Sequence, residues 1–151
     1  MSVAFRREND DEHLEPRFEL PIPAGPNLVT PRGRALIEER IATLEAALAE
    51  AADEEAVKAV RRDLRYWATR RATAIETPPR DDGAVGFGNR VTYRLAGKER
   101  VVTLVGDDEA DPGAGAIAFS APLARALMGA EAGEFVGFNG REDAIEVVAV
   151  A

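Results

Sequence analysis

Two runs of apolar residues at heptad spacing, separated by a short acidic break, restrict the fold of residues 30–76 most strongly. The first run advances by steps of 4, 3, 4 and 3 through Ile37, Ile41, Leu44, Leu48 and Ala51. The second run repeats this spacing through Val57, Val60, Leu64, Trp67, Arg71 and Ala74. Such spacing places the apolar side chains along one side of a helix, where a second helix can cover them. We therefore predict an antiparallel coiled-coil hairpin over residues 30–76, with its bend at residues 53–55.

The start of the first helix has its own signal. Thr30 is a good N-cap residue, and Pro31 is tolerated at the first helical position because no partner is needed there for the missing N–H. A helix over residues 30–51 is about 33 Å long at 1.5 Å per residue. Basic residues then crowd the second helix at Lys58, Arg61, Arg62 and Arg65. The helix dipole accounts for them less well than for Arg70 and Arg71, so this face is either simply solvated or functional.

The segments on either side of the hairpin differ from it in composition. Residues 1–29 are charged and rich in proline, which predicts an extended or disordered leader. Residues 77–83 read Thr-Pro-Pro-Arg-Asp-Asp-Gly, which is typical of a linker. We expect residues 84–151 to form a separate domain.

The C-terminal domain is predicted to be a small β-sheet domain with one short helix, so the chain belongs to the α+β class. A Gly97-Lys98 turn is expected between the first two strands, and Gly129 is expected to end the helix over 122–128. The expected strands are Val85–Leu95, Glu99–Val105, Ala116–Phe119, Phe135–Phe138 and Ile145–Val150.

Composition excludes several kinds of site. The chain has no cysteine and a single histidine, His13, so thiolate chemistry and multi-histidine metal sites are ruled out. The net charge of −8 is unfavourable for independent binding to duplex nucleic acid. No apolar run is long enough to span a membrane, and no apolar signal core follows Met1. We expect a cytoplasmic protein, a monomer without a membrane partner.

The most distinctive local pattern is an acidic turn followed by a Ser-x-Pro helix start. Asp107, Asp108, Glu109 and Asp111 precede Pro112 between two apolar runs, and the sequence from Ser120 to Gly129 then begins a small helix. Ser120 is expected to cap this helix. The four acids form either a solvated turn or a surface that docks a partner.

These residues resemble a known family. The resemblance to the C-terminal domain of the bacterial Gre transcript-cleavage factors, GreA and GreB, covers Val85–Gly88, Val105–Pro112, Ala116–Phe119, Ser120–Gly129 and Ala132–Glu134. Asn27–Gly33 also resembles the start of the family's coiled coil. The resemblance implies an FKBP-like C-terminal domain behind an N-terminal coiled coil.

The resemblance also implies a function in transcription. Gre factors dock on bacterial RNA polymerase beside its secondary channel, and their coiled coil enters the channel, so contact with nascent RNA and with DNA comes through the polymerase complex. Acids at the tip help to hold a Mg²⁺ ion of the polymerase active site, while the factor is no enzyme and has no cofactor of its own. The implied positions are Asp53, Glu54 and Glu55 at the tip, Lys58, Arg61, Arg62 and Arg65 facing RNA, and Asp107, Asp108, Glu109, Asp111, Pro112, Ser120, Pro122 and Arg125 for docking.

The hairpin departs from the family pattern. Each arm is shorter by roughly ten residues, which removes about 15 Å of reach. Asp53 is followed three residues later by Ala56, where the family has an acid. An alternative is therefore a modulator that occupies the channel entrance without stimulating cleavage, by analogy with the short-armed regulators of nucleoside diphosphate kinase.

Two further alternatives come from other classes. An FKBP-like fold raises the possibility of a prolyl isomerase, which needs an aromatic-lined pocket. The aromatic residues available in the C-terminal part are Phe87, Tyr93, Phe119, Phe135 and Phe138. The other alternative is a plain coiled-coil interaction module, against which the acidic turn and the Ser-x-Pro motif argue.

Overall fold

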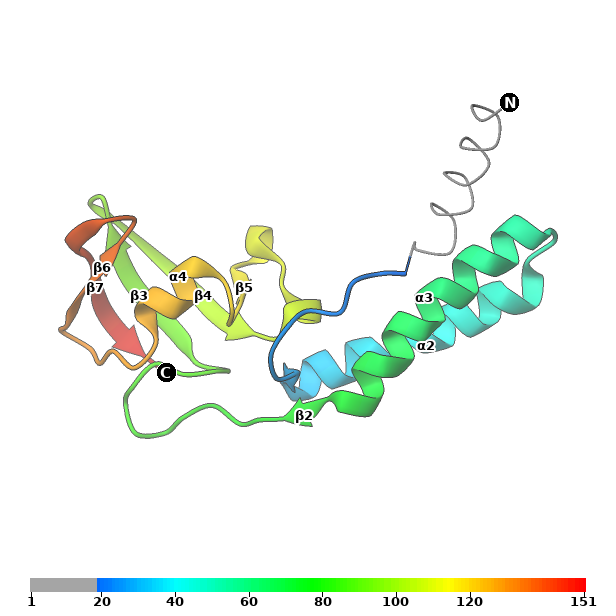
Figure 1. Cartoon of the computed structure of the whole chain (residues 1–151). Coiled ribbons are helices and arrows are strands. Elements are labelled where there is room, and N and C mark those ends of the chain that lie inside the picture. The colour runs from blue at the N-terminus through cyan, green and yellow to red at the C-terminus, as the bar shows by residue number, and fades with distance from the viewer. Residues whose placement is uncertain (1–18) are drawn as a thin grey trace, which may run out of the picture. The chain divides into compact units, whose positions relative to one another are not determined.

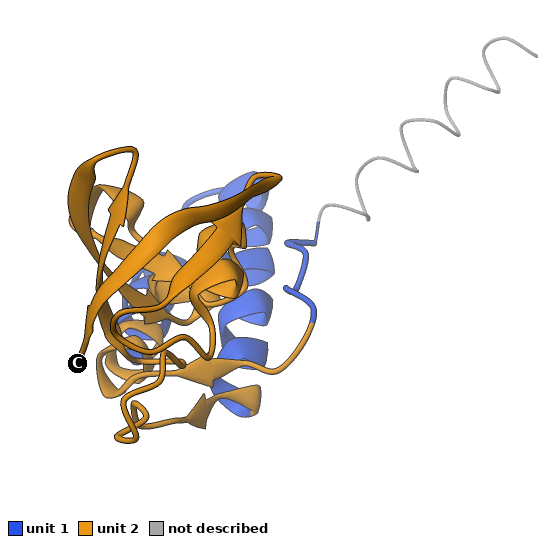
Figure 2. Ribbon diagram, turned by 90° about the vertical axis from the view of Figure 1, so that its left-hand side faces the viewer, with its two compact units in different colours: residues 1–24, 38–72 blue, residues 25–37, 73–151 orange. Residues whose placement is uncertain are grey.

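A computed structural model of the chain describes residues 19–151. The first part of the predicted leader, residues 1–18, lies outside the described residues. The chain divides into two compact units (Figure 2). We call residues 19–24 and 38–72 the helical unit, and residues 25–37 and 73–151 the sheet unit. The division differs from the expected boundaries, because the end of the leader and the first part of the first helix belong to the sheet unit.

Two helices span the residues of the predicted hairpin. Helix α2 spans Pro31–Glu50 and helix α3 spans Glu54–Thr73 (Figure 1). Asp53 starts α3, because its Oδ1 accepts a hydrogen bond from the backbone N–H of Ala56 at 2.8 Å. Glu54 and Glu55 in the first turn and Arg70 and Arg71 in the last turn both suit the helix dipole.

The two helices contact one another through the long side chains of α2 and α3. The guanidinium of Arg40 lies 5.7 Å from the centre of the Trp67 ring, and Arg71 pairs with Glu38 at 3.4 Å. Arg71 was expected in the apolar seam, but it is exposed and Arg70 is buried instead. The helices are thus established, while the coiled-coil packing stays a prediction.

The sheet unit contains a five-stranded sheet in the order β5-β4-β3-β7-β6. Strand β4 pairs parallel with β5, and the other pairs are antiparallel. Helix α4 covers one face, where Ala124 and Leu127 are fully buried against the core. The elements are β3 (Arg90–Leu95), β4 (Lys98–Val105), β5 (Ala116–Ala118), α4 (Pro122–Leu127), β6 (Phe135–Phe138) and β7 (Arg141–Val150).

This architecture confirms the mixed α+β class, and the FKBP-like assignment stays a prediction. The first strand begins later than expected, at Arg90, because residues 85–89 form a loop. The β3–β4 turn also lies one residue earlier than expected. Ala96 and Gly97 have φ of 53° and 78°, as a two-residue hairpin turn of this kind requires, and Lys98 already belongs to β4.

A short parallel pair of strands was not expected from the sequence. Strand β1 (Leu28–Val29) pairs with β2 (Ile75–Glu76), and the amide of Asn27 donates to the Thr73 hydroxyl at 3.1 Å. The end of the predicted leader is therefore a structured part of the sheet unit.

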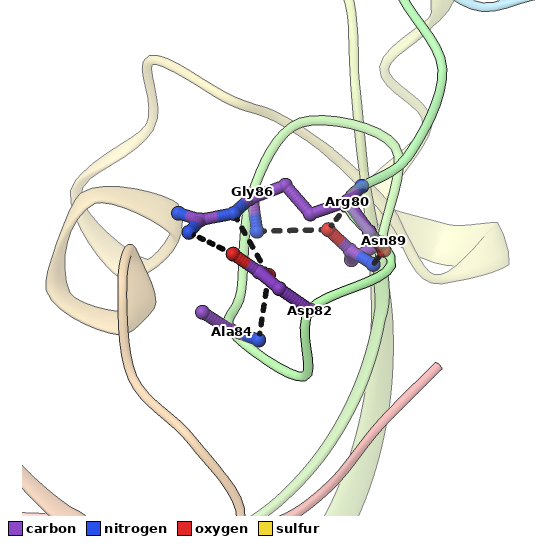
Figure 3. Close-up of polar contacts among 5 residues, drawn as sticks. All are labelled: Arg80, Asp82, Ala84, Gly86 and Asn89. Carbon is purple, nitrogen blue, oxygen red and sulfur yellow. Dashed lines mark hydrogen bonds and ion pairs between the residues drawn. The ribbon is translucent and has the colours of Figure 1, made fainter.

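The expected linker is also fixed over its second half, because the buried side chain of Asn89 holds it (Figure 3). Asn89 Oδ1 accepts hydrogen bonds from the backbone N–H groups of Gly86 (2.9 Å) and Arg80 (3.2 Å). Its Nδ2 donates to the carbonyl oxygens of Arg80 and Ala151, both at 3.0 Å. The Arg80 guanidinium donates hydrogen bonds to both carboxylate oxygens of Asp82, and these bonds lower the pKa of the Asp82 carboxyl.

Within residues 19–151, no helix is long and apolar enough to cross a membrane.

Candidate partner-docking surface

The acidic turn is a hydrogen-bonded part of the sheet unit. It follows β4 as two short 3-10 helices, η1 (Asp107–Glu109) and η2 (Pro112–Ala114), before β5 begins. The backbone of Asp111 exchanges two hydrogen bonds with Ala116, at 2.7 Å and 3.1 Å. Asp107 and Asp108 are half-buried, whereas Asp111 and Pro112 are exposed. The turn therefore presents its acids from a fixed backbone.

Ser120 connects this turn to helix α4. Its hydroxyl donates a hydrogen bond to Asp107 Oδ1 at 2.7 Å. The expectation that Ser120 caps α4 is wrong, because Ala121 occupies the N-cap position and no side chain caps the helix. The hydroxyl instead joins the two sequence motifs, since Pro122, which opens the helix, follows two residues later.

The exposed members of the two motifs give one candidate surface. Ser120, Pro122 and Arg125 are exposed at the start and on the outer side of α4, as Asp111 and Pro112 are on the turn. Leu127 faces the core instead. We call Asp111, Pro112, Ser120, Pro122 and Arg125 the turn–helix surface.

Glu109 was expected on that surface, but its side chain is only 6% exposed. Its Oε1 accepts a hydrogen bond from the Thr30 hydroxyl at 2.5 Å, and its Oε2 pairs with Arg32 at 3.1 Å. The Thr30 Oγ1 in turn accepts from the backbone N–H of Gly33 at 2.9 Å, so Thr30 caps α2 as expected. Glu109 thus holds the start of α2, and this internal role removes it from the docking acids.

The segment before α2 approaches the turn closely at Gly106. A Cβ atom at this position would lie 2.4 Å from the carbonyl oxygen of Leu28. A Cβ at Gly33 would likewise lie 2.8 Å from Glu109 Oε1. Only glycine fits at position 106 without a backbone shift. The glycine itself is therefore the sequence signal for this contact.

The acids at the hairpin bend differ in what they do. Asp53 uses its carboxylate to cap α3, whereas Glu54 and Glu55 are exposed. Across residues 19–151, no cluster of three or more His, Asp or Glu side chains is arranged to hold a metal ion. The Mg²⁺-assisting role of these acids stays a prediction.

The basic residues of α3 lie in the helical unit. Lys58 and Arg61 are exposed, Arg62 pairs with Asp63 at 3.4 Å, and Arg65 binds Glu19 through both carboxylate oxygens. The sequence carried no signal for the contact between Glu19 and Arg65, because opposite charges 46 positions apart have no fixed spacing.

The aromatic residues considered for an isomerase pocket are mostly part of the core. Phe87 and Tyr93 are buried, and the Phe87 ring packs edge-to-face on Phe119 with 5.4 Å between ring centres. Burial raises the pKa of Tyr93.

Comparison with known proteins finds similarity in the C-terminal part of the chain. Residues 80–151 match the family model described as transcription elongation factor GreA/GreB, C-terminal. The GreA of Allorhizobium ampelinum is 36% identical over 88 residues, which cover 54% of this chain and 54% of that protein. The GreA of Sinorhizobium medicae is 37% identical over 84 residues, which cover 53% of each chain. The chain therefore spans about half the length of the curated relatives that it matches.

Among solved structures, the GreA factor homologue 1 (Gfh1) of Thermus thermophilus superposes with a TM-score of 0.40 at 16% identity. This superposition covers 84% of the present chain and 99% of that one.

Proposed function

We propose that the protein is an elongation regulator that binds bacterial RNA polymerase, because residues 80–151 match the model of the C-terminal domain of the GreA/GreB transcription elongation factors. The protein acts on the polymerase and contributes no active site of its own. The docking position is beside the secondary channel, which the helical hairpin enters.

The hydrogen bond from Ser120 to Asp107 is the observation that carries this proposal. It holds the acidic turn and the start of α4 together, so that the exposed acid Asp111 and the exposed base Arg125 are presented from one preorganised part of the sheet unit. A preorganised surface loses little conformational entropy when it binds a partner. Mixed charges on such a surface give orientation and association rate more than raw affinity.

The docking role does not need the acids that the fold already uses. Glu109 is committed to Thr30 and Arg32, and the half-buried Asp107 accepts from Ser120. Asp111 and Pro112 are the exposed part of the turn. We therefore assign partner contact to the turn–helix surface, with Asp108 at its edge.

A second candidate function is favoured by the structure of the bend. The carboxylate of Asp53 accepts a hydrogen bond from the N–H of Ala56. Binding a cation there would compete with this bond, which caps α3. Helices α2 and α3 have 20 residues each, or about 30 Å of length. In this second candidate the protein occupies the channel and slows or biases elongation without stimulating RNA cleavage.

One assay separates the two candidates. Backtracked elongation complexes are incubated with the wild-type chain, with the tip variant Glu54→Gln/Glu55→Gln, and with a matched control. The control is Glu45→Gln/Glu50→Gln, which removes the same charge from exposed positions of α2. A cleavage-stimulating factor shortens the RNA, and the tip variant loses this effect while the control keeps it. A channel-occupying modulator changes the elongation rate without shortening the RNA. A chain that changes neither elongation nor cleavage contradicts both candidates.

A further inference from the structure

Glu19, in the described part of the leader, contacts the basic side of helix α3. Glu19 and Arg65, which belong to the same helical unit, form a two-pronged ion pair. Arg65 Nε donates to Glu19 Oε1 at 2.8 Å, and Nη2 donates to Oε2 at 2.5 Å. The hydrogen bonds from Arg65, with a smaller contribution from the charge of Arg62, lower the pKa of Glu19. The Glu19 carboxylate therefore interacts with two arginines of α3.

These two arginines belong to a longer row. Lys58, Arg61, Arg62 and Arg65 are spaced by three, one and three positions, which places them on one side of the helix over two turns. We call these four residues the basic stripe. The guanidinium fork that holds a carboxylate by two hydrogen bonds is also the geometry that holds a phosphate. Glu19 thus occupies the position on Arg65 that a phosphate of a nucleic acid would take.

We propose that the leader is an intramolecular competitor of single-stranded RNA for the basic stripe, so that Glu19 must leave Arg65 before RNA phosphates bind there. This inference rests on the proposed function, in which the helical hairpin enters the polymerase channel, and on the RNA-facing role that the family resemblance implies for the stripe. The sequence before Glu19 adds further acids, namely Glu8, Asp10, Asp11, Glu12 and Glu15. The leader therefore carries the same sign of charge as the ligand that it excludes.

The ion pair is well suited to reversible release. Its two side chains are 58% and 52% exposed, and exposed pairs of this kind are weak and are screened by salt. A polyanion that reaches several members of the stripe at once gains more contacts than the single carboxylate that it displaces. The leader then raises the RNA concentration that is needed for binding to the stripe. RNA binds only where its own local concentration is high, as it is inside a polymerase channel.

The first test measures RNA binding by the isolated full-length chain. A fluorescent single-stranded RNA is titrated at low ionic strength with the wild type, Glu19→Gln, Lys58→Gln and Glu45→Gln, the last being an exposed acid of α2 that controls for net charge. Glu19→Gln is expected to bind roughly two- to fivefold more tightly than Glu45→Gln, the change that loss of an exposed ion pair produces. Lys58→Gln is expected to bind more weakly than the wild type.

The second measurement follows the ion pair directly. The ¹⁵N–¹H resonance of Arg65 Nε is expected to shift in Glu19→Gln and to shift again when RNA is added, whereas Lys58→Gln leaves the free-state resonance in place. The inference is overturned if Glu19→Gln binds RNA no more tightly than Glu45→Gln, including the case in which neither binds. That outcome leaves the proposed function standing, because polymerase binding through the turn–helix surface is measured separately.

Discussion

The Glu109 carboxylate accepts a hydrogen bond from the Thr30 hydroxyl at 2.5 Å, although the two residues are 79 positions apart. Glu109 belongs to the acidic turn, and Thr30 caps helix α2. The first turn of α2 and the acidic turn are therefore held together inside the sheet unit. Glu109 serves the fold and the half-buried Asp107 accepts from Ser120, so the exposed Asp111 is the clearest candidate for a docking acid.

Replacing Glu109 should destabilise the sheet unit. Glu109→Ala removes the hydrogen-bond acceptor of the half-buried Thr30 hydroxyl and the ion-pair partner of Arg32. We therefore expect a loss of about 1–3 kcal/mol in the free energy of unfolding. Urea denaturation followed by circular dichroism measures this loss. Glu142→Ala, at an exposed position of β7, is the control and should change stability little. Equal stability of the two variants would refute the internal role of Glu109.

A methyl group at Gly106 should be poorly tolerated. The added Cβ of Gly106→Ala meets the Leu28 carbonyl oxygen at 2.4 Å, and a backbone atom cannot rotate away. We expect a cost of about 1–3 kcal/mol, typical of overpacking, seen as a lower Tm in calorimetry. Gly113→Ala is the matched control, because its nearest neighbour is a side-chain oxygen at 3.7 Å. Equal Tm values for the two variants would contradict the close contact between Gly106 and Leu28.

Asn89 should contribute more to the free energy of unfolding than its position in a loop suggests. Asn89→Ala removes both the acceptor of two backbone N–H groups and the donor to two carbonyl oxygens, at a buried site. We expect a loss of about 2–3 kcal/mol, because buried backbone groups are left without partners. Urea denaturation measures this loss. Asp82→Asn weakens the exposed ion pair with Arg80 but keeps an oxygen that can accept from the N–H of Ala84, so it should cost much less. The reverse order would contradict this account.

Tyr93 should make the fold sensitive to alkaline pH. Burial raises the pKa of Tyr93 in the folded chain above its value of about 10 in the unfolded chain. The neutral phenol is therefore favoured by folding, and its contribution is complete below about pH 10 and is lost as the pH rises through the folded pKa. The decrease in unfolding free energy between pH 9 and pH 11 should be smaller in Tyr93→Phe than in the wild type. An identical decrease in both proteins would show that Tyr93 does not titrate with unfolding.

The elements with a regular period could be predicted from the sequence. The heptad seams predicted α2 and α3 because their apolar positions recur at helical spacing, and the strand over Phe135–Phe138 was predicted with its observed bounds. Strand β1 was missed because two residues are too few for a period. The internal roles of Glu109 and Asn89 were missed because each depends on tertiary contacts that no local pattern encodes.

The central claim is that the turn–helix surface binds RNA polymerase. The most direct measurement is the affinity of core polymerase for fluorescently labelled wild type, Asp111→Arg and Glu142→Arg, the last placing the same change of charge on an exposed position of β7. Our account predicts that Asp111→Arg binds at least about tenfold more weakly, since like charges are brought together at the interface, while Glu142→Arg stays close to the wild type. Equal affinity of all three proteins, or no binding by the wild type, would contradict it.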